Sequence, residues 1–255
     1  MIIVKSPREI ELMKEAGRLV AKVFETVEPH IKPGVSTYEI NKIAEEVIYA
    51  GGGSCPCKGY YDYPAGTCVS VNDTLIHGIP SKKIILREGD IVSLDVVACL
   101  KGYCADATRT FGVGILKESV KQLMQVTKDA FYEGIKMAKP DNHVGDISHA
   151  IQQYVESFGY SLARDFTGHG IGKSMHEDPS VPNYGIAGTG PLLKPGMTIA
   201  VEPMVLEGKK ETRILGDGWT VKSRDGKLTC HYENTIVITE DGNEIITLTE
   251  GEKRN

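Results

Sequence analysis

Apolar residues recur at helical spacing in two segments near the beginning of the chain, residues 6–30 and 36–53. The first stripe contains Ile10, Met13, Val20, Phe24 and Val27, and the second contains Ile40, Ile43, Val47 and Ile48. A capping box opens each segment, formed by Ser6 with Glu9 and by Ser36 with Glu39. A proline follows the first cap and glycines follow the second stripe, so the pattern predicts two helices with defined ends.

The apolar pattern then changes to runs that are typical of strands, at residues 67–79, 89–100 and 103–114. After these strands the order begins again. Two amphipathic segments, at 118–140 and 144–160, predict helices. Strand-like residues follow at 196–205 and 232–239. The chain therefore reads as a pair of helices followed by strands, twice.

The two halves also match at a constant offset of 107 residues. That shift places LREGDIVSLDV (86–96) over LKPGMTIAVEP (193–203), and Asp95 then falls on Glu202. We interpret the match as an internal duplication. Two similar halves that face each other across a pseudo-twofold axis would bring both carboxylates to one central cleft.

The duplication predicts a single domain over residues 1–255, with halves of about 1–115 and 116–255. The offset breaks between the last two strands, where Asp106 would match Glu233 at 127 residues. An insertion that carries GKKETRILGDGWT (208–220) would account for the difference.

Two aspartates lie in an apolar hairpin, SLDVVACLKGYCADATRTF, at residues 93–111. If Lys101-Gly102 is the turn, Asp95 falls opposite Thr108, and Asp106 is its same-face diagonal neighbour, roughly 7–8 Å away. A turn at Leu100-Lys101 would keep both acids on one face as well. Because a carboxylate in an apolar strand is costly without a partner, two acids that share a face predict a cation.

Composition adds few constraints. The chain has 41% hydrophobic and 25% charged residues, with a net charge of -5, which gives no reason to expect a nucleic-acid or membrane surface. No apolar run approaches the length of a membrane span, and the first residues lack a signal-peptide layout. We therefore expect a cytoplasmic protein.

The six cysteines do not predict a disulfide framework, which is improbable in a cytosolic chain of this size. SCPC suggests zinc, but no second pair lies at finger spacing. Four of the cysteines are expected to be reduced, partly buried thiols, whereas Cys57 and Cys68 are left open.

The second half supplies further polar residues in glycine-rich or apolar surroundings. DFTGHGIGKSMHEDP contains His169 and His176, Glu202 precedes a proline in a strand, and Glu233 begins another strand. Each alone is weak, because such residues are more often structural. Together, Asp95, Asp106, Glu202 and Glu233 are four acids on four strand segments, and they would raise one another's pKa unless cations neutralise them. Two divalent ions, Mn(II), Fe(II), Co(II) or Zn(II), suit this mostly oxygen donor set.

The motifs GHGIGKSMHEDP, MTIAVEPMV, YENTIVIT and HGIP, with the D-x10-D hairpin, resemble methionine aminopeptidases of type I along nearly the whole chain. The resemblance implies an α+β pita-bread fold, with two pseudo-symmetric halves of antiparallel sheet covered by helices. It also implies a single catalytic domain that removes the initiator methionine from new polypeptides, favouring a small second residue.

Carried over by motif, the resemblance implies five metal ligands. Asp95 would bind one ion, His169 with Glu202 the other, and Asp106 and Glu233 would bridge the two. The ions, Co, Mn, Fe, Zn or Ni, would activate a bridging hydroxide to attack the scissile carbonyl and would anchor the substrate amine. Glu202 would relay the proton.

Beside the ions, His77 would lie near the scissile amide and His176 would steady the oxyanion. The methionine pocket implied by the family consists of Cys57, Tyr60, Tyr63, Cys68, Met175 and Trp219. Met175 departs from the phenylalanine of bacterial relatives, and CPC around Cys57 differs from the usual pattern.

Four other interpretations compete with this one. Prolidase and aminopeptidase P share the fold and ligands but normally carry an N-terminal domain. A type II methionine aminopeptidase would have a helical insertion in the second half. A metal-free pita-bread binding module would be expected to lack several ligands. An unspecified α/β protein would not explain five coincident motifs.

The expected partners are the N-termini of nascent polypeptides. A transient ribosome contact fits the activity, although no basic tail supports it, and no nucleic-acid or membrane partner is expected. The protein is expected to be a monomer, because no coiled-coil heptad or self-complementary stripe is present.

Overall fold

The computed structural model describes residues 1–254 and has four long helices. They are α1 (Pro7–Val27), α2 (Thr37–Ala50), α3 (Glu118–Ile135) and α4 (Val144–Ser157), with 3-10 turns at Glu28–His30, Tyr60–Asp62 and Glu252–Arg254. Both predicted capping boxes form. The carboxylates of Glu9 and Glu39 accept hydrogen bonds from the cap backbones of Ser6 (2.9 Å) and Ser36 (2.8 Å).

The strands are β1 (Cys68–Val71), β2 (Thr74–Ile76), β3 (Ile91–Leu100), β4 (Tyr103–Gly112), β5 (Ser161–Leu162), β6 (Gly168–Gly170), β7 (Glu177–Val181), β8 (Thr198–Val201), β9 (Met204–Leu206), β10 (Thr212–Ile214), β11 (Val221–Ser223), β12 (Thr229–His231), β13 (Glu233–Ile238) and β14 (Asn243–Ile245). The main sheet has the order β1-β3-β4-β13-β8-β6-β7, with β14 beside β13, and every pair in it is antiparallel. Two small sheets, β10-β11-β2 and β12-β9-β5, lie beside it.

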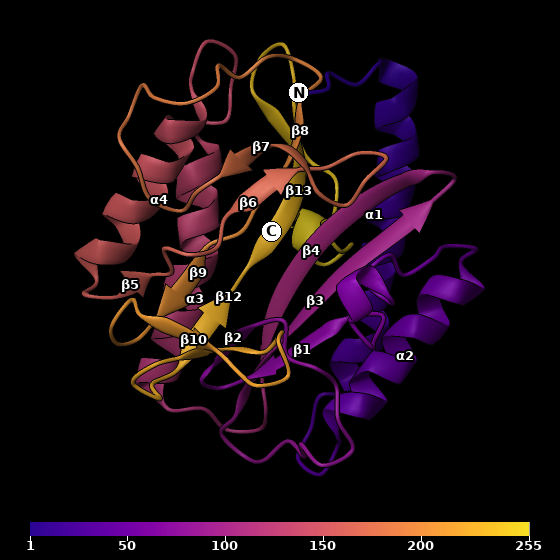
Figure 1. Ribbon diagram of the computed structural model, residues 1–255, viewed down its shortest axis with the longest axis vertical. Helices are drawn as coiled ribbons and strands as arrows, with labels where there is room; N and C mark the ends of the chain where they lie inside the picture. The colour runs from indigo at the N-terminus through magenta and orange to yellow at the C-terminus, as the bar shows by residue number, and fades with distance from the viewer. Residues whose placement is uncertain (255) are drawn as a thin grey trace.

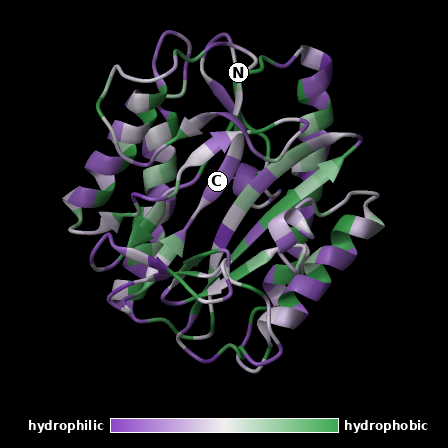
Figure 2. Ribbon diagram, in the orientation of Figure 1, coloured by the Kyte–Doolittle hydropathy of each residue, from purple (hydrophilic) through white to green (hydrophobic). Residues whose placement is uncertain are grey.

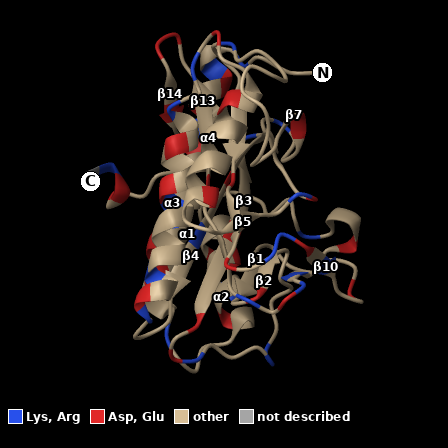
Figure 3. Cartoon of the chain, turned by 90° about the vertical axis from the view of Figure 1, so that its left-hand side faces the viewer, with Lys and Arg blue, Asp and Glu red and all other residues tan. Residues whose placement is uncertain are grey.

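Helices and sheet form two layers, with one apolar core in each part of the sheet. α1 and α2 pack on β3 and β4, and α3 and α4 pack on the strands of the second half. In Figure 2 the helices change between green and purple around each turn, as expected for amphipathic helices with one buried face. Seen from the side in Figure 3, α1 and α3 lie on one side of the sheet and β2 and β10 on the other, with charges of both signs interspersed.

No helix among the described residues is long and apolar enough to cross a membrane.

The pairing of β4 with β13 at the middle of the main sheet joins the two parts of the chain. On either side of this pair the strands follow in the same way, β3 then β1 in one direction and β8 then β6 in the other. Residues 208–220, predicted to interrupt the duplication, contain β10, which lies outside the main sheet. The division into halves at about residue 115 within one catalytic domain stays a prediction.

The hairpin has the predicted register. Lys101 (φ 51°) and Gly102 (φ 82°) form its two-residue turn, and both take the left-handed conformation that such a turn needs. Asp95 lies opposite Thr108, and Asp106 lies opposite Val97 on the diagonal. The alternative turn at Leu100 is therefore wrong.

Three predicted elements are shorter or divided. The third helix ends at Ile135 rather than at Pro140. Just after this end, the side chain of Asn243 donates to the carbonyls of Ile135 (2.7 Å) and Ala138 (3.1 Å). The strand predicted at 67–79 divides into β1 and β2 at Asn72, which has a positive φ of 54°. Pro203 divides the strand predicted at 196–205, because proline cannot donate to a sheet.

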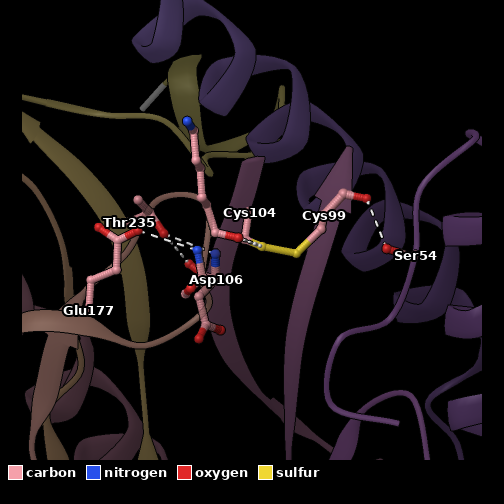
Figure 4. The surroundings of a disulfide bond; sticks show 8 residues. Ser54, Cys99, Cys104, Asp106, Glu177 and Thr235 are labelled. Carbon is pink, nitrogen blue, oxygen red and sulfur yellow. Dashed lines mark hydrogen bonds between the residues drawn. A yellow bond between two sulfur atoms is a disulfide. The ribbon is translucent and has the colours of Figure 1, made fainter. Parts of the chain in front are cut away.

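The cysteines include one pair that the sequence did not predict. Cys99 and Cys104 form a disulfide across β3 and β4, directly beside the hairpin turn (Figure 4). Their Cα atoms are 4.0 Å apart because the register places them opposite each other, which brings the two sulfurs within bonding reach. The expectation that both are reduced thiols is therefore wrong, while Cys55 and Cys230 are free and buried.

Arg109 supports the β4–β13 pairing from the helix side of the sheet. The backbone ladder between these strands has only two residue pairs, Glu233 with Thr108 and Asn234 with Ala107. Arg109, 6% exposed, donates to the Glu233 carbonyl (2.6 Å) and the Asn234 side chain (2.7 Å). It also forms two hydrogen bonds with the carboxylate of Glu252, at 2.8 and 3.0 Å. The planar guanidinium thus holds two strands and the C-terminal turn together.

We expect the Arg109→Lys substitution to lower the free energy of unfolding by about 2 to 4 kcal/mol, because lysine keeps the charge but loses the fork of donors. Urea unfolding measures the effect, with Arg213→Lys on the exposed face of β10 as the matched control. Equal losses in the two variants would contradict a structural role for the buried guanidinium.

Candidate metal centre

A cavity of about 360 Å³ opens at the middle of the main sheet, and all five predicted ligands line it. They come from five adjoining strands or strand ends, Asp95 on β3, Asp106 on β4, Glu233 on β13, Glu202 directly after β8 and His169 on β6. Figure 1 shows these strands side by side at the centre of the molecule.

Strand register explains why the acids share one face. Thr108 on β4 lies opposite Asp95 on β3 and opposite Glu233 on β13, so one threonine separates the two carboxylates. Its hydroxyl donates to Glu233 Oε2 at 2.8 Å. Asp106 lies two residues before Thr108 and therefore points to the same face, because side chains alternate along a strand.

His169 joins the cluster through its Nε2 atom. This atom lies 3.6 Å from Asp106 Oδ2 and 3.7 Å from Glu202 Oε1, while Nδ1 is bonded to the Gly170 carbonyl at 2.9 Å. Burial alone would lower the pKa of His169, but the neighbouring Asp106 and Glu202 carboxylates raise it to about 9.

Glycines on both sides of His169 let the backbone pack closely. A Cβ atom at Gly168 would lie 2.4 Å from the carbonyl oxygen of Ala200, and one at Gly170 would lie 2.0 Å from that of Asp178. Larger residues would push β6 away from its neighbours. The two glycines are therefore required by the close approach of the β6 backbone to β7 and β8.

The acids are crowded and poorly compensated. Asp106 is 4% exposed and Glu233 2%, and Asp106 Oδ1 and Glu233 Oε1 are buried without a hydrogen-bond partner. Burial raises the pKa of Asp95 and Glu233 far above the usual range, and the neighbouring Asp106 raises both further. Such a cluster is costly unless a cation or protons neutralise it.

The same atoms fit divalent cations. The structure contains two groups of three metal-donor residues. One is Asp106 with His169 and Glu233, and the other is Glu202 with His231 and Glu233. Within each group the donor atoms lie within 4.8 Å of one another. Glu233 belongs to both groups, and the unpartnered oxygens supply free lone pairs. Carboxylate and imidazole donors suit Mn, Fe, Co, Ni or Zn. Asp95 lines the same cavity but belongs to neither group.

Two further histidines lie at the cavity, as expected. Burial lowers the pKa of His77 to about 4, helped by the facing His231 and His176, so its ring is neutral at pH 7. His176 is exposed, with its ring centre 4.5 Å from that of His169 and its Nδ1 atom 3.5 Å from the Tyr60 hydroxyl. Although the residue is exposed overall, its ring is partly desolvated between His169 and Tyr60, and this desolvation together with the neighbouring His169 lowers the pKa of His176.

The wall beside these groups contains all six residues predicted for the pocket: Cys57, Tyr60, Tyr63, Cys68, Met175 and Trp219. Burial raises the pKa of both thiols well above the usual range, with Cys68 adding to the effect at Cys57 and Asp95 at Cys68. The two cysteines are therefore free, neutral thiols in this wall, and their role in the pocket stays a prediction.

Among the residues that sequence reasoning missed, two contact the predicted groups directly. His231 belongs to the group of metal donors that contains Glu202 and Glu233. The sequence carried a signal for it, because His231 lies two residues before Glu233 and alternate residues of a strand share a face. Phe166 lines the cavity with its ring centre 6.1 Å from that of His77. No motif marked Phe166, since only folding brings it to His77.

Comparison with known proteins gives a consistent result. The model of metallopeptidase family M24 matches residues 11–240. Methionine aminopeptidase of Clostridium perfringens is 48% identical, over 97% of this chain and 99% of that protein. The crystal structure of methionine aminopeptidase from Thermotoga maritima superposes with a TM-score of 0.95 at 45% identity, covering 97% of this chain and 100% of that one.

A prolidase from Pyrococcus furiosus shares the fold, with a TM-score of 0.79 at 25% identity, but this chain covers only 66% of it. The competing prolidase interpretation therefore fits less well, in both identity and length. The curled antiparallel sheet with its helices is the pita-bread fold predicted from the sequence. By its likeness along almost the whole chain, this protein belongs to the methionine aminopeptidases of metallopeptidase family M24.

Proposed function

We propose that this protein removes the N-terminal methionine of new polypeptides with two divalent ions, held by Asp95, Asp106, His169, Glu202 and Glu233. The observation that carries the proposal is the cavity itself, which is lined by these groups together with thiols, aromatic rings and Met175. The acids and His169 suit an ion-assisted hydrolysis, and the thiols, rings and Met175 suit a methionine side chain.

Bound divalent ions, whether Co, Mn, Fe, Zn or Ni, would make water nucleophilic near neutral pH and polarise the scissile carbonyl. Asp106 and Glu233 would hold both ions, and the buried oxygen that each has without a partner supports this role. Asp95 would hold one ion, and His169 with Glu202 the other. Glu202, 9% exposed at the cavity, would accept the proton of the attacking water on a carboxylate oxygen and pass it to the leaving amine.

His77 and His176 would act on the substrate's peptide group. His77 is neutral at pH 7, so its ring offers both a donor and an acceptor to the scissile amide. His176 is the exposed neighbour of His169, which places a donor at the open side of the acid cluster. There it would donate to the oxyanion of the tetrahedral intermediate.

The thiols, rings and Met175 would select methionine by shape and polarisability. The hydroxyl of Tyr63 donates to backbone carbonyls of Thr67 (3.2 Å) and Gly78 (3.1 Å), so the ring shows only its apolar body to the cavity. Trp219 packs edge-on to Tyr63 with the ring centres 5.1 Å apart. Thioether sulfur packs well against aromatic edges and soft sulfur atoms.

We further propose that the protein acts on nascent chains in the cytoplasm, as a monomer with one catalytic domain. The transient ribosome contact, the absence of nucleic-acid and membrane partners and the preference for a small second residue stay predictions.

Asp106→Asn should abolish release of methionine from Met-Gly-Met-Met, because the amide removes the negative charge and an oxygen donor from the shared position. The assay compares metal-free protein with protein given Co(II) or Mn(II). Asp141→Asn, at an exposed position with a φ of 69° that asparagine also adopts, should keep full activity. Release of the first methionine by the Asp106 variant at the wild-type rate would refute the assignment.

Trp219→Ala should raise KM for a methionine substrate roughly tenfold or more, with a smaller change in kcat, because it removes apolar wall rather than a reacting group. Steady-state kinetics measure both constants. Phe158→Ala, 43% exposed at the end of α4, is the control. A fall in kcat with unchanged KM would speak against a pocket role.

Stability without metal should fall as the pH rises from 6.5 to 9. The folded state keeps a proton on His169, whose pKa is about 9, after the unfolded chain releases it near 6.5. The raised pKa values of Asp95 and Glu233 act in the same direction above about pH 4.5.

Urea unfolding in EDTA should therefore give a declining free energy over this pH range, and saturating Co(II) should stabilise the protein more at high pH than at low pH. His169→Gln should flatten the decline in EDTA. A metal-free stability that rises toward pH 9 would contradict this view of the cluster.

A further inference from the structure

His231 has a side chain that neither the sequence motifs nor the proposed ligand set uses. The residue is 2% exposed, and its Nε2 atom is buried without a hydrogen-bond partner. A buried imidazole nitrogen in this state is costly unless something binds it. The atom lies 3.4 Å from Glu202 Oε2.

The position of His231 is fixed by its backbone. The carbonyl of His231 accepts a hydrogen bond from the Thr110 hydroxyl at 2.7 Å. The N–H of His231 donates to the oxygen of that hydroxyl at 3.3 Å. On the other side it pairs with Met204 in the β12–β9 ladder. Because side chains alternate along a strand, the imidazole follows Glu233 to the same face.

Glu202 lies between two imidazoles. His169 Nε2 lies 3.7 Å from Oε1, and His231 Nε2 lies 3.4 Å from Oε2. Each histidine belongs to a separate group of three donors within 4.8 Å of one another, and the two groups share Glu233. The nitrogen donors are therefore distributed one to each group.

We propose that His231 is a sixth protein ligand of the metal centre, binding a divalent ion through Nε2 together with Glu202 and Glu233. The inference rests on the metal centre of the proposed function and adds a second imidazole to it. Because imidazole suits Fe, Co, Ni and Zn whereas carboxylate suits Mn, the additional nitrogen biases the centre toward the former metals.

The test is the number of imidazoles bound to Co(II), counted by proton NMR of the Co(II)-loaded protein. A coordinated neutral histidine keeps the proton on its other nitrogen and gives one hyperfine-shifted, solvent-exchangeable N–H resonance. The wild-type protein should show two such resonances. His231→Gln and His169→Gln should each show one.

Exposed His30 provides the matched control, and His30→Gln should keep both resonances. The dissociation constant for Co(II), measured by competition with a chelator, should rise about tenfold or more in His231→Gln and stay unchanged in His30→Gln.

A single resonance in the wild-type protein, or two in His231→Gln, would overturn the proposal and leave His231 as a group that only lies beside Glu202. The wild-type count decides by itself if His231→Gln fails to fold. Wild-type protein that binds no Co(II) would instead refute the metal centre of the proposed function, so the two failures are distinguishable.

Discussion

The mutual repulsion of buried carboxylates at the centre of an apolar sheet is the constraint on which the rest of this structure depends. Asp95, Asp106, Glu202 and Glu233 line one cavity, and burial with their own proximity raises the pKa of Asp95 and Glu233. A fold that holds such a cluster must have stability to spare elsewhere and a partner for the charge. Divalent cations would meet the second condition, and the helix-packed cores meet the first.

The strands that carry the cluster separate chemistry from support by alternation. On β4, Asp106 and Thr108 point to the face of the sheet that carries the acid cluster. Arg109 lies on the opposite, helix-covered face and binds β13 through Asn234. Arg109 in turn is held by Glu252 from the C-terminal turn. A junction of only two residue pairs is thus strengthened from behind, which keeps Asp106 and Glu233 in register without placing another group in the cavity.

The cavity combines two chemical environments. Charged oxygens and histidines line it, and so do neutral thiols and the rings of Tyr63 and Trp219, which pack against each other. His77 is at the boundary, with its ring centre 5.7 Å from that of Trp219 and its pKa lowered by burial. A substrate that presents an apolar sulfur-containing side chain beside a peptide bond fits such a boundary.

The sequence by itself determined the helices with their serine caps, the hairpin turn at Lys101-Gly102 and the same-face placement of Asp95 and Asp106, because local periodicity and turn chemistry act over a few residues. The motifs also indicated the family and the five residues of the cluster. Only the tertiary structure decided that Asn243 bonds the end of the third helix, that Cys99 meets Cys104, that His231 comes within reach of Glu202 and Glu233, and that Phe166 lines the cavity. These features depend on contacts between segments far apart in the chain, and local patterns carry no information about which segments will meet.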